Sequence, residues 1–167
     1  MNLTPDVVIW AIMAIFILGG GLGVVTSRNL IHGAMYLILA LFGMAGMFIL
    51  LEAPFLAAVQ ILVYVGAISV LITITVMVTR RVMGATENVN HQWPVAAVVA
   101  VLVFGMLGFV IVSQFGATQP SGAVPADYIN QMGMALVDHQ GYLLPFEVAS
   151  VLLLAAMIGS IVVARDK

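Results

Sequence analysis

Charged side chains are scarce in this chain of 167 residues, only 7% of which are Asp, Glu, Lys or Arg. A soluble domain carries roughly 25% charged residues, so this chain lacks the polar surface that water requires. Cysteine is absent altogether. Its absence excludes a Cys-ligated iron–sulfur cluster, a Cys-linked haem and a disulfide framework. No basic patch indicates nucleic acid as a partner, and the composition is that of an integral membrane protein in a lipid bilayer.

Hydrophobic residues make up 63% of the chain and gather into five long runs. Each run has the roughly 17–25 residues that an α-helix needs to cross a bilayer. We therefore predict an all-α membrane protein with a single domain over residues 1–167 and an outer loop at residues 116–142. The expected spans are Val7–Val25, Leu30–Leu51, Phe55–Val78, Trp93–Val112 and Leu143–Ala164.

The positive charges predict the orientation of these spans. All five Lys and Arg residues fall in the first loop, the third loop or the C-terminal tail, namely Arg28, Arg80, Arg81, Arg165 and Lys167. Five spans place those three segments on one side of the membrane, and Lys and Arg favour the cytoplasmic side. The N-terminus is then outside and the C-terminus cytoplasmic.

The outer loop has two parts of different character. Residues 116–125 are rich in Gly, Pro and Ser, which favours irregular structure. Residues 127–137 place apolar side chains near helical spacing, which suits a short helix at the membrane interface. A disordered loop is the alternative, and the sequence leaves both open.

The third predicted span carries polar residues and a glycine at its centre. Gln60 and Tyr64 lie four residues apart, which places them on one face of a regular helix, and Gly66 follows. One interpretation is that the two polar side chains bond to a neighbouring helix. The other is that Gly66 permits a π-bulge, a one-residue insertion that often marks functional sites. From spacing alone we favour the first.

Hydroxyl side chains continue the polar character of this span. They are Ser69, Thr73, Thr75 and Thr79. Hydroxyls in helices bond back to the carbonyl four residues earlier, so we predict a structural role for them.

Glycines are frequent in three other predicted spans. The pairs are Gly19 and Gly23 in the first span, Gly43 and Gly46 in the second, and Gly105 and Gly108 in the fourth. Small residues let helix backbones approach closely in lipid, so these glycines predict close packing within the chain or with other subunits.

Glu147 stands at the outer start of the last predicted span, two residues after Pro145. Proline at the first helical position followed by a carboxylate is typical of a helix start. The alternative makes Glu147 a member of a proton path or of an interhelical ion pair. No acidic residue lies at the centre of a predicted span, so the chain is not expected to pump protons by itself. No pair of histidines has the spacing of a metal or haem site.

Three stretches resemble a known family. They are residues 55–71, which include Gln60, Tyr64 and Gly66, residues 28–34, and residues 144–159. These stretches resemble subunit J of bacterial NADH–quinone oxidoreductase, whose mitochondrial counterpart is NADH dehydrogenase subunit 6. The resemblance implies a five-helix membrane subunit with a π-bulge near Tyr64 and Gly66, and so it favours the second interpretation of the third span.

The resemblance also implies a function. The chain would be a non-catalytic subunit of a proton-translocating NADH:quinone oxidoreductase, a translocase of the bacterial cell membrane or of another energy-coupling membrane such as the thylakoid. Its third helix would switch between bulged and regular forms, with Gln60, Tyr64, Gly66 and Ser69 as the switch residues.

The same resemblance implies the partners. The chain itself would bind no cofactor or metal, while quinone, FMN, iron–sulfur clusters and NADH would belong to other subunits. The neighbouring membrane subunits would be H and A of the quinone module, subunit K and the antiporter-like subunit N. The rival interpretation is a structural subunit of a membrane-bound hydrogenase or of a cation/proton antiporter complex. An independent transporter is disfavoured because no charged residue lies at the centre of a span.

Overall fold

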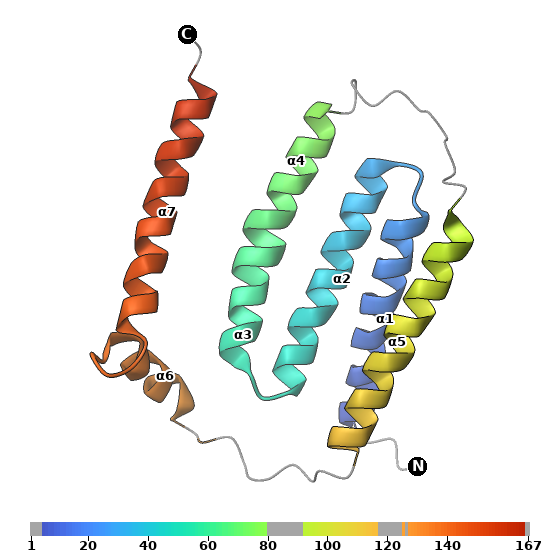
Figure 1. Ribbon diagram of the computed structural model, residues 1–167, viewed down its shortest axis with the longest axis horizontal. Helices are drawn as coiled ribbons and strands as arrows, with labels where there is room; N and C mark the ends of the chain where they lie inside the picture. Colours follow the sequence, from blue (N-terminus) through green and yellow to red (C-terminus); the bar gives the residue numbers. More distant parts are fainter. Residues whose placement is uncertain (1–4, 80–91, 117–124, 126, 166–167) are drawn as a thin grey trace. The chain divides into compact units, whose positions relative to one another are not determined.

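The computed structural model describes residues 5–79, 92–116, 125 and 127–165. This part of the chain is helical, with five helices long and apolar enough to cross a membrane (Figure 1). The all-α, five-span prediction is therefore confirmed. The helices divide into two units, Met1–Ser121 and Gly122–Lys167, each of which is described by itself. Arg80, Arg81 and Lys167, on which the predicted orientation partly rests, lie outside the described residues.

The first unit is built around its second helix. Its elements are α1 (Pro5–Thr26), α2 (Leu30–Leu50), α3 (Pro54–Val59), η1 (Gln60–Ile68), α4 (Ser69–Thr79) and α5 (Trp93–Phe115). The elements α3, η1 and α4 follow one another without a break and form the third span, Pro54–Thr79. Helix α2 packs along α1 and also contacts all three parts of the third span (Figure 1).

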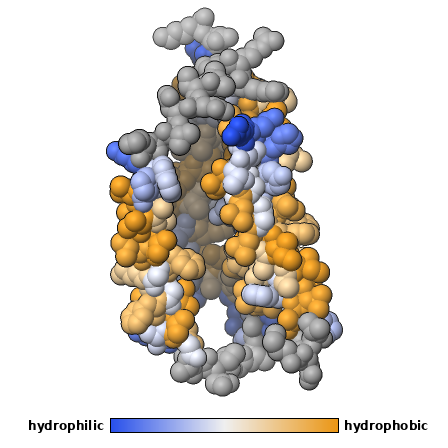
Figure 2. Space-filling view, turned by 90° about the vertical axis from the view of Figure 1, so that its right-hand side faces the viewer, coloured by the Kyte–Doolittle hydropathy of each residue, from blue (hydrophilic) through white to orange (hydrophobic). Residues whose placement is uncertain are grey.

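Almost every buried side chain in these helices is small. The buried residues are Gly20, Ala34, Gly43, Ala45, Ala57, Gln60 and Ser69. Large apolar side chains are exposed instead, and they cover the middle of the helices visible in Figure 2, where hydrophilic residues gather toward the ends. Small residues at helix contacts let backbones approach closely, while large apolar ones suit lipid or neighbouring subunits.

The contact between α1 and α2 uses Gly20 in place of the predicted Gly19. A Cβ at Gly20 would lie 2.8 Å from the Ala40 nitrogen and 2.8 Å from the Tyr36 carbonyl oxygen, so only glycine fits between the two backbones. A Cβ at Gly19 would meet nothing within 4 Å among the described residues. Gly19 is therefore on another face, because adjacent residues in a helix point roughly 100° apart. The predicted contact of Gly23 is confirmed, against the Tyr36 ring.

Two turns with defined hydrogen bonds join the first three spans. The Asn29 side chain caps α2 by accepting a hydrogen bond from the Ile31 N–H at 3.0 Å. After α2, Ala53 N–H donates to the Phe48 carbonyl and Glu52 N–H to the Ile49 carbonyl. This pattern is a Schellman motif, and Glu52 occupies its left-handed position with φ 55°.

The second unit contains α6 (Tyr128–Val137) and α7 (Leu143–Ala164). Helix α6 agrees with the short helix predicted at residues 127–137. The turn between the two helices is closed by the Tyr142 N–H, which donates to the Ala135 carbonyl at 2.8 Å. Asp138 supports the turn by accepting a hydrogen bond from the Gln140 N–H at 3.2 Å.

Candidate functional site

The centre of the third span is a wide helical turn. Residues Gln60–Ile68 form a π-helix of nine residues, the type of helix whose characteristic hydrogen bond runs from an N–H to the carbonyl five residues earlier. Its C-terminal end is set by the Ser69 N–H, which donates to the Tyr64 carbonyl. The π-bulge implied by the family resemblance is therefore present, and spacing alone had favoured the other interpretation.

Gln60 anchors the N-terminal end of the wide turn to α2. Its side chain is 7% exposed, and its Nε2 donates to the Leu41 carbonyl at 3.3 Å. The bond to a neighbouring helix that the first interpretation expected is thus also present at Gln60. The two interpretations apply to different parts of one site.

The prediction that Gln60 and Tyr64 share a face is wrong. Gln60 is buried and Val65 is half-buried, whereas Tyr64 is 45% exposed. A turn of π-helix takes between four and five residues, so Tyr64 falls short of the Gln60 direction and Val65 passes it, and the burial shows that Val65 is the one turned toward α2. The face that packs on α2 therefore passes from Gln60 to Val65, and Tyr64 is turned away from it.

Ser69 closes the wide turn with its side chain. The Ser69 Oγ donates to the Tyr64 carbonyl at 2.7 Å, and the side chain is 1% exposed. The prediction that the Ser69 hydroxyl bonds to the carbonyl four residues earlier is therefore wrong. The inserted residue places the carbonyl five residues earlier, that of Tyr64, within reach of the hydroxyl instead. The same prediction is confirmed at the three threonines, where Thr73 donates to Ser69, Thr75 to Leu71 and Thr79 to Thr75, each at 2.8 Å.

Gly66 lies inside the wide turn, where space for a side chain is limited. A Cβ at this position would lie 3.3 Å from the Ile61 carbonyl oxygen. That contact is tighter than nine in ten real Cβ contacts, so the Ile61 carbonyl would have to shift by a few tenths of an ångström to admit a side chain. Glycine therefore fits this position without a shift of the Ile61 carbonyl, which a residue with a Cβ would require.

A signal for the insertion was present in the sequence. Gln60 and Ser69 are nine positions apart, so in a regular helix they point roughly 180° away from each other. Both are nevertheless buried in a span whose neighbour is α2. One inserted residue removes roughly 100° of that angle, which brings both side chains to the α2 side. Leu41 offers only a backbone carbonyl, so no side-chain pattern could have identified it.

Glu147 belongs to the second unit and is exposed. Helix α7 begins at Leu143, so Pro145 is its third residue and the prediction that it opens the helix is wrong. Proline is tolerated there because the first four N–H groups of a helix have no partner within the helix. Glu147 is the fifth residue of α7, outside its first turn, which weakens the explanation of this carboxylate as a helix-start residue.

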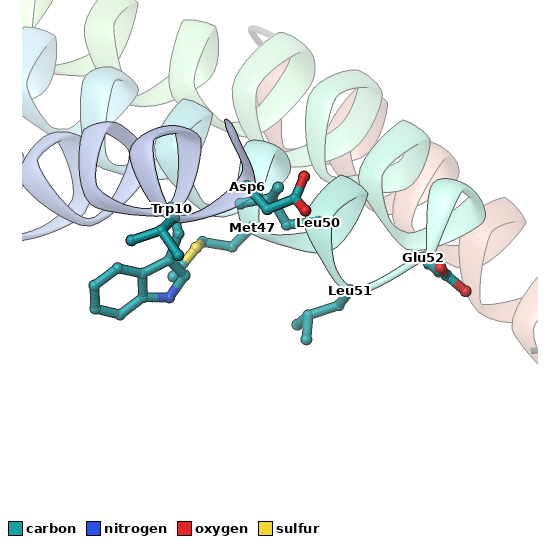
Figure 3. Close-up of a pocket in the computed structure, with 7 residues that line it drawn as sticks. Asp6, Trp10, Met47, Leu50, Leu51 and Glu52 are labelled. Atoms are coloured by element: carbon teal, nitrogen blue, oxygen red, sulfur yellow. The ribbon is translucent and has the colours of Figure 1, made fainter. Parts of the chain in front are cut away.

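A separate pocket of about 490 Å³ lies between the start of α1 and the end of α2. The Trp10 ring and the Met47 thioether lie side by side at one end, with Glu52 at the other (Figure 3). The carboxylates of Asp6 and Glu52 do not point toward one another (Figure 3). Over the described residues, no group of three His, Asp or Glu side chains is placed to hold a metal ion. The wide turn of the third span is thus the candidate site.

Comparison with known proteins gives a consistent picture. The sequence profile of the family described as NADH-ubiquinone/plastoquinone oxidoreductase chain 6 matches residues 20–163. An NAD(P)H-quinone oxidoreductase chain 6 from Leptolyngbya boryana is 37% identical over 99% of this chain and 83% of the relative. An F(420)H(2) dehydrogenase subunit J from Methanosarcina mazei is 34% identical over 97% of this chain and 92% of the relative.

Proposed function

The chain belongs to the NADH-ubiquinone/plastoquinone oxidoreductase chain 6 family, and from this we propose that it couples quinone reduction to proton translocation through a switch in its third span. As a family member it is a membrane subunit of a quinone-linked oxidoreductase complex. The proposal concerns what this subunit contributes to that complex. It rests on one observation, the π-helical turn at Gln60–Ile68.

The same residues of the third span could form either the wide turn or a regular α-helix. Removal of the insertion would convert η1 into a regular α-helix and rotate one half of the span by roughly 100° relative to the other. Gly66 is the hinge, because a side chain at this position would press against the Ile61 carbonyl of the wide turn. Tyr64, now turned away from α2, would move onto the face that Gln60 occupies.

Such a rotation would change the polar groups that the span offers to its surroundings. Tyr64 is 45% exposed to whatever packs beside the span, and displacement of its side chain would make or break a hydrated path there. Coupling then requires no redox group in this chain. Quinone, FMN, iron–sulfur clusters and the electron donor would be held by other subunits of the complex.

Glu147 is the second residue assigned to this function. It is exposed within the first half of α7, so it is accessible to a neighbouring subunit as a proton-path carboxylate. We place the chain beside subunits H and A of the quinone module, subunit K and the antiporter-like subunit N, in the bacterial cell membrane or a thylakoid. Its N-terminus would be outside, because five spans put the segments of Arg28 and Arg165 on the same side and positive residues favour the cytoplasmic side.

The test uses the purified complex in proteoliposomes. A Gly66→Val substitution would overpack the wide turn, which costs about 1–3 kcal/mol and so lowers the bulged population roughly fivefold or more. We expect slower quinone reduction, weaker proton pumping, or both. The matched control is Gly105→Val, because a Cβ at Gly105 meets nothing within 4 Å in the described chain. Unchanged reduction and pumping rates in Gly66→Val would sink the proposal.

The electron donor is identified by the soluble subunits that copurify with the chain. The names of the relatives point to NAD(P)H or to reduced F(420). A flavin-containing donor subunit in the purified complex supports the proposed function. Recovery of hydrogenase subunits or of antiporter subunits alone would favour the rival assignment to one of those complexes.

A further inference from the structure

We propose that the Ser69 hydroxyl is a positioning group that holds the third span in its bulged register. This proposal rests on the proposed switch and names the side chain that sets the equilibrium between the bulged and the regular form of the span. It concerns the contact between Ser69 and Tyr64, two residues that lie on either side of Gly66.

One carbonyl receives both hydrogen bonds that Ser69 can donate. The Tyr64 carbonyl accepts the Ser69 N–H and also the Ser69 Oγ–H, the latter at 2.7 Å. A carbonyl oxygen has two lone pairs, so this acceptor is fully used by a single residue. The turn is therefore closed twice at the same point, once by the backbone and once by the side chain.

This side-chain bond is specific to the bulged register. The other hydroxyls of the span, at Thr73, Thr75 and Thr79, bond to the carbonyl four residues earlier, as hydroxyls in regular helices do. Ser69 reaches back five residues, to a carbonyl that is one turn away only while the insertion is present. Conversion to a regular helix breaks this bond.

The burial of Ser69 adds to its preference for this register. The side chain is 1% exposed, and a buried hydroxyl without a partner is unfavourable. Gln60, bonded to Leu41 at the other end of the turn, is also buried. A regular helix would point these two side chains roughly 180° apart, so it would remove one of them from α2. The bulged register is the one that satisfies both.

The experiment compares variants of the complete complex. Ser69→Ala removes the hydroxyl, and Ser69→Cys keeps the volume but offers only a weak donor. The measurement is hydrogen–deuterium exchange of the amides in residues 64–69, which reports opening of the wide turn. We expect exchange to rise roughly threefold to tenfold in both variants, as the loss of one net hydrogen bond predicts. We also expect a lower kcat with an unchanged KM for quinone.

Two controls separate the hydroxyl from general structural damage. Thr73→Val removes an equivalent bond, from Thr73 to the Ser69 carbonyl at 2.8 Å, one turn beyond the insertion, and should leave exchange at residues 64–69 unchanged. Ser69→Thr retains a hydroxyl and should restore kcat. If the Ser69→Ala variant fails to assemble, exchange in the Ser69→Cys variant tests the proposal.

The outcomes distinguish this proposal from the function it rests on. Unchanged exchange in the Ser69→Cys variant would overturn the positioning role. Faster exchange together with unchanged kcat and unchanged pumping would establish the positioning role and contradict the proposed coupling function. Faster exchange with lower kcat and rescue by Ser69→Thr supports both.

Discussion

The contact of α1 with α2 and the contact of α2 with the third span hold helices together in different ways. At the first contact, Gly20 lies so close to α2 that a single Cβ would approach the backbone at Ala40 and Tyr36 to 2.8 Å. At the second, a polar side chain, Gln60, bonds to the Leu41 carbonyl, and Ser69 closes a wide turn. One contact is made by backbone proximity and the other by a few hydrogen bonds.

This difference determines what each contact permits. Backbone-to-backbone packing of small residues has one register, because any slip brings a larger side chain to the point of closest approach. A turn held by individual hydrogen bonds would have a second register under the proposed switch, in which each backbone N–H bonds to the carbonyl four residues earlier and the Ser69 hydroxyl loses its bond to Tyr64. The molecule therefore combines a closely packed helix pair with a span whose wide turn we propose to be a switch.

The largest effect should come from a substitution at the closely packed pair. Gly20→Val places a branched side chain against the α2 backbone, and overpacking of this kind costs about 1–3 kcal/mol or more. We expect little of this variant in the assembled complex, measured as the amount of subunit that copurifies. Gly21→Val is the control, since a Cβ at Gly21 meets nothing within 4 Å in the described chain. Equal recovery of both variants would contradict the comparison.

An intermediate effect is expected at the turn that joins the closely packed pair. Asn29→Ala removes the cap of α2, in which Asn29 accepts from the Ile31 N–H at 3.0 Å. Loss of such a cap lowers the free energy of unfolding by about 1 kcal/mol. Thermal denaturation of the complex should show a lower midpoint, and Asn29→Asp, which keeps an acceptor oxygen, should show almost none of this change.

A smaller loss of stability, with a larger change in function, is expected at Gln60. Gln60→Leu removes the bond to Leu41, and such bonds between membrane helices contribute about 0.6 kcal/mol. The complex should assemble normally while turnover falls several-fold. Gln114→Leu, at an exposed amide in α5, is the matched control. A change in assembly without any change in turnover would mean that Gln60 belongs to the fixed part of the molecule.

The smallest effect should be a gain in stability, at the turn that joins α2 to the third span. Glu52 adopts φ 55°, a left-handed conformation that disfavours residues with a Cβ. Glu52→Gly removes that penalty at the expense of chain entropy, so we expect a net stabilisation of about 0.5 kcal/mol. A raised thermal midpoint with unchanged turnover would check it, and a lowered midpoint would show that the Glu52 side chain contributes more than its backbone conformation costs.

The five spans could be predicted from the sequence because length and apolarity are sufficient for them. The packing faces could not. In water, the buried face of a helix is its apolar face, but these helices expose large apolar residues on almost every side, and what they bury is glycine, alanine and a few polar groups. The choice of Gly20 over Gly19 as the contact residue followed from helix rotation, which hydrophobic periodicity did not reveal.

The wide turn illustrates a different limit. Spacing rules assume a regular helix, so they placed Gln60 with Tyr64 and paired Ser69 with the carbonyl four residues earlier. Each error has the same cause, an insertion of one residue between them. The resemblance to a known family indicated the insertion. Its physical sign in the sequence was the separation of nine positions between Gln60 and Ser69, two polar residues of one apolar span. Pro145 was misplaced for a simpler reason, since proline is acceptable anywhere in the first helical turn.

The small-residue core of the first unit also bears on how the cell controls this subunit. Helices whose buried contacts are glycine, alanine and two polar side chains keep their large apolar side chains on the outside, exposed to lipid until neighbouring chains cover them. A newly made copy without those neighbours would be an orphan, open to membrane proteases. Its abundance should therefore follow that of its partners, and its half-life should lengthen sharply once it is assembled.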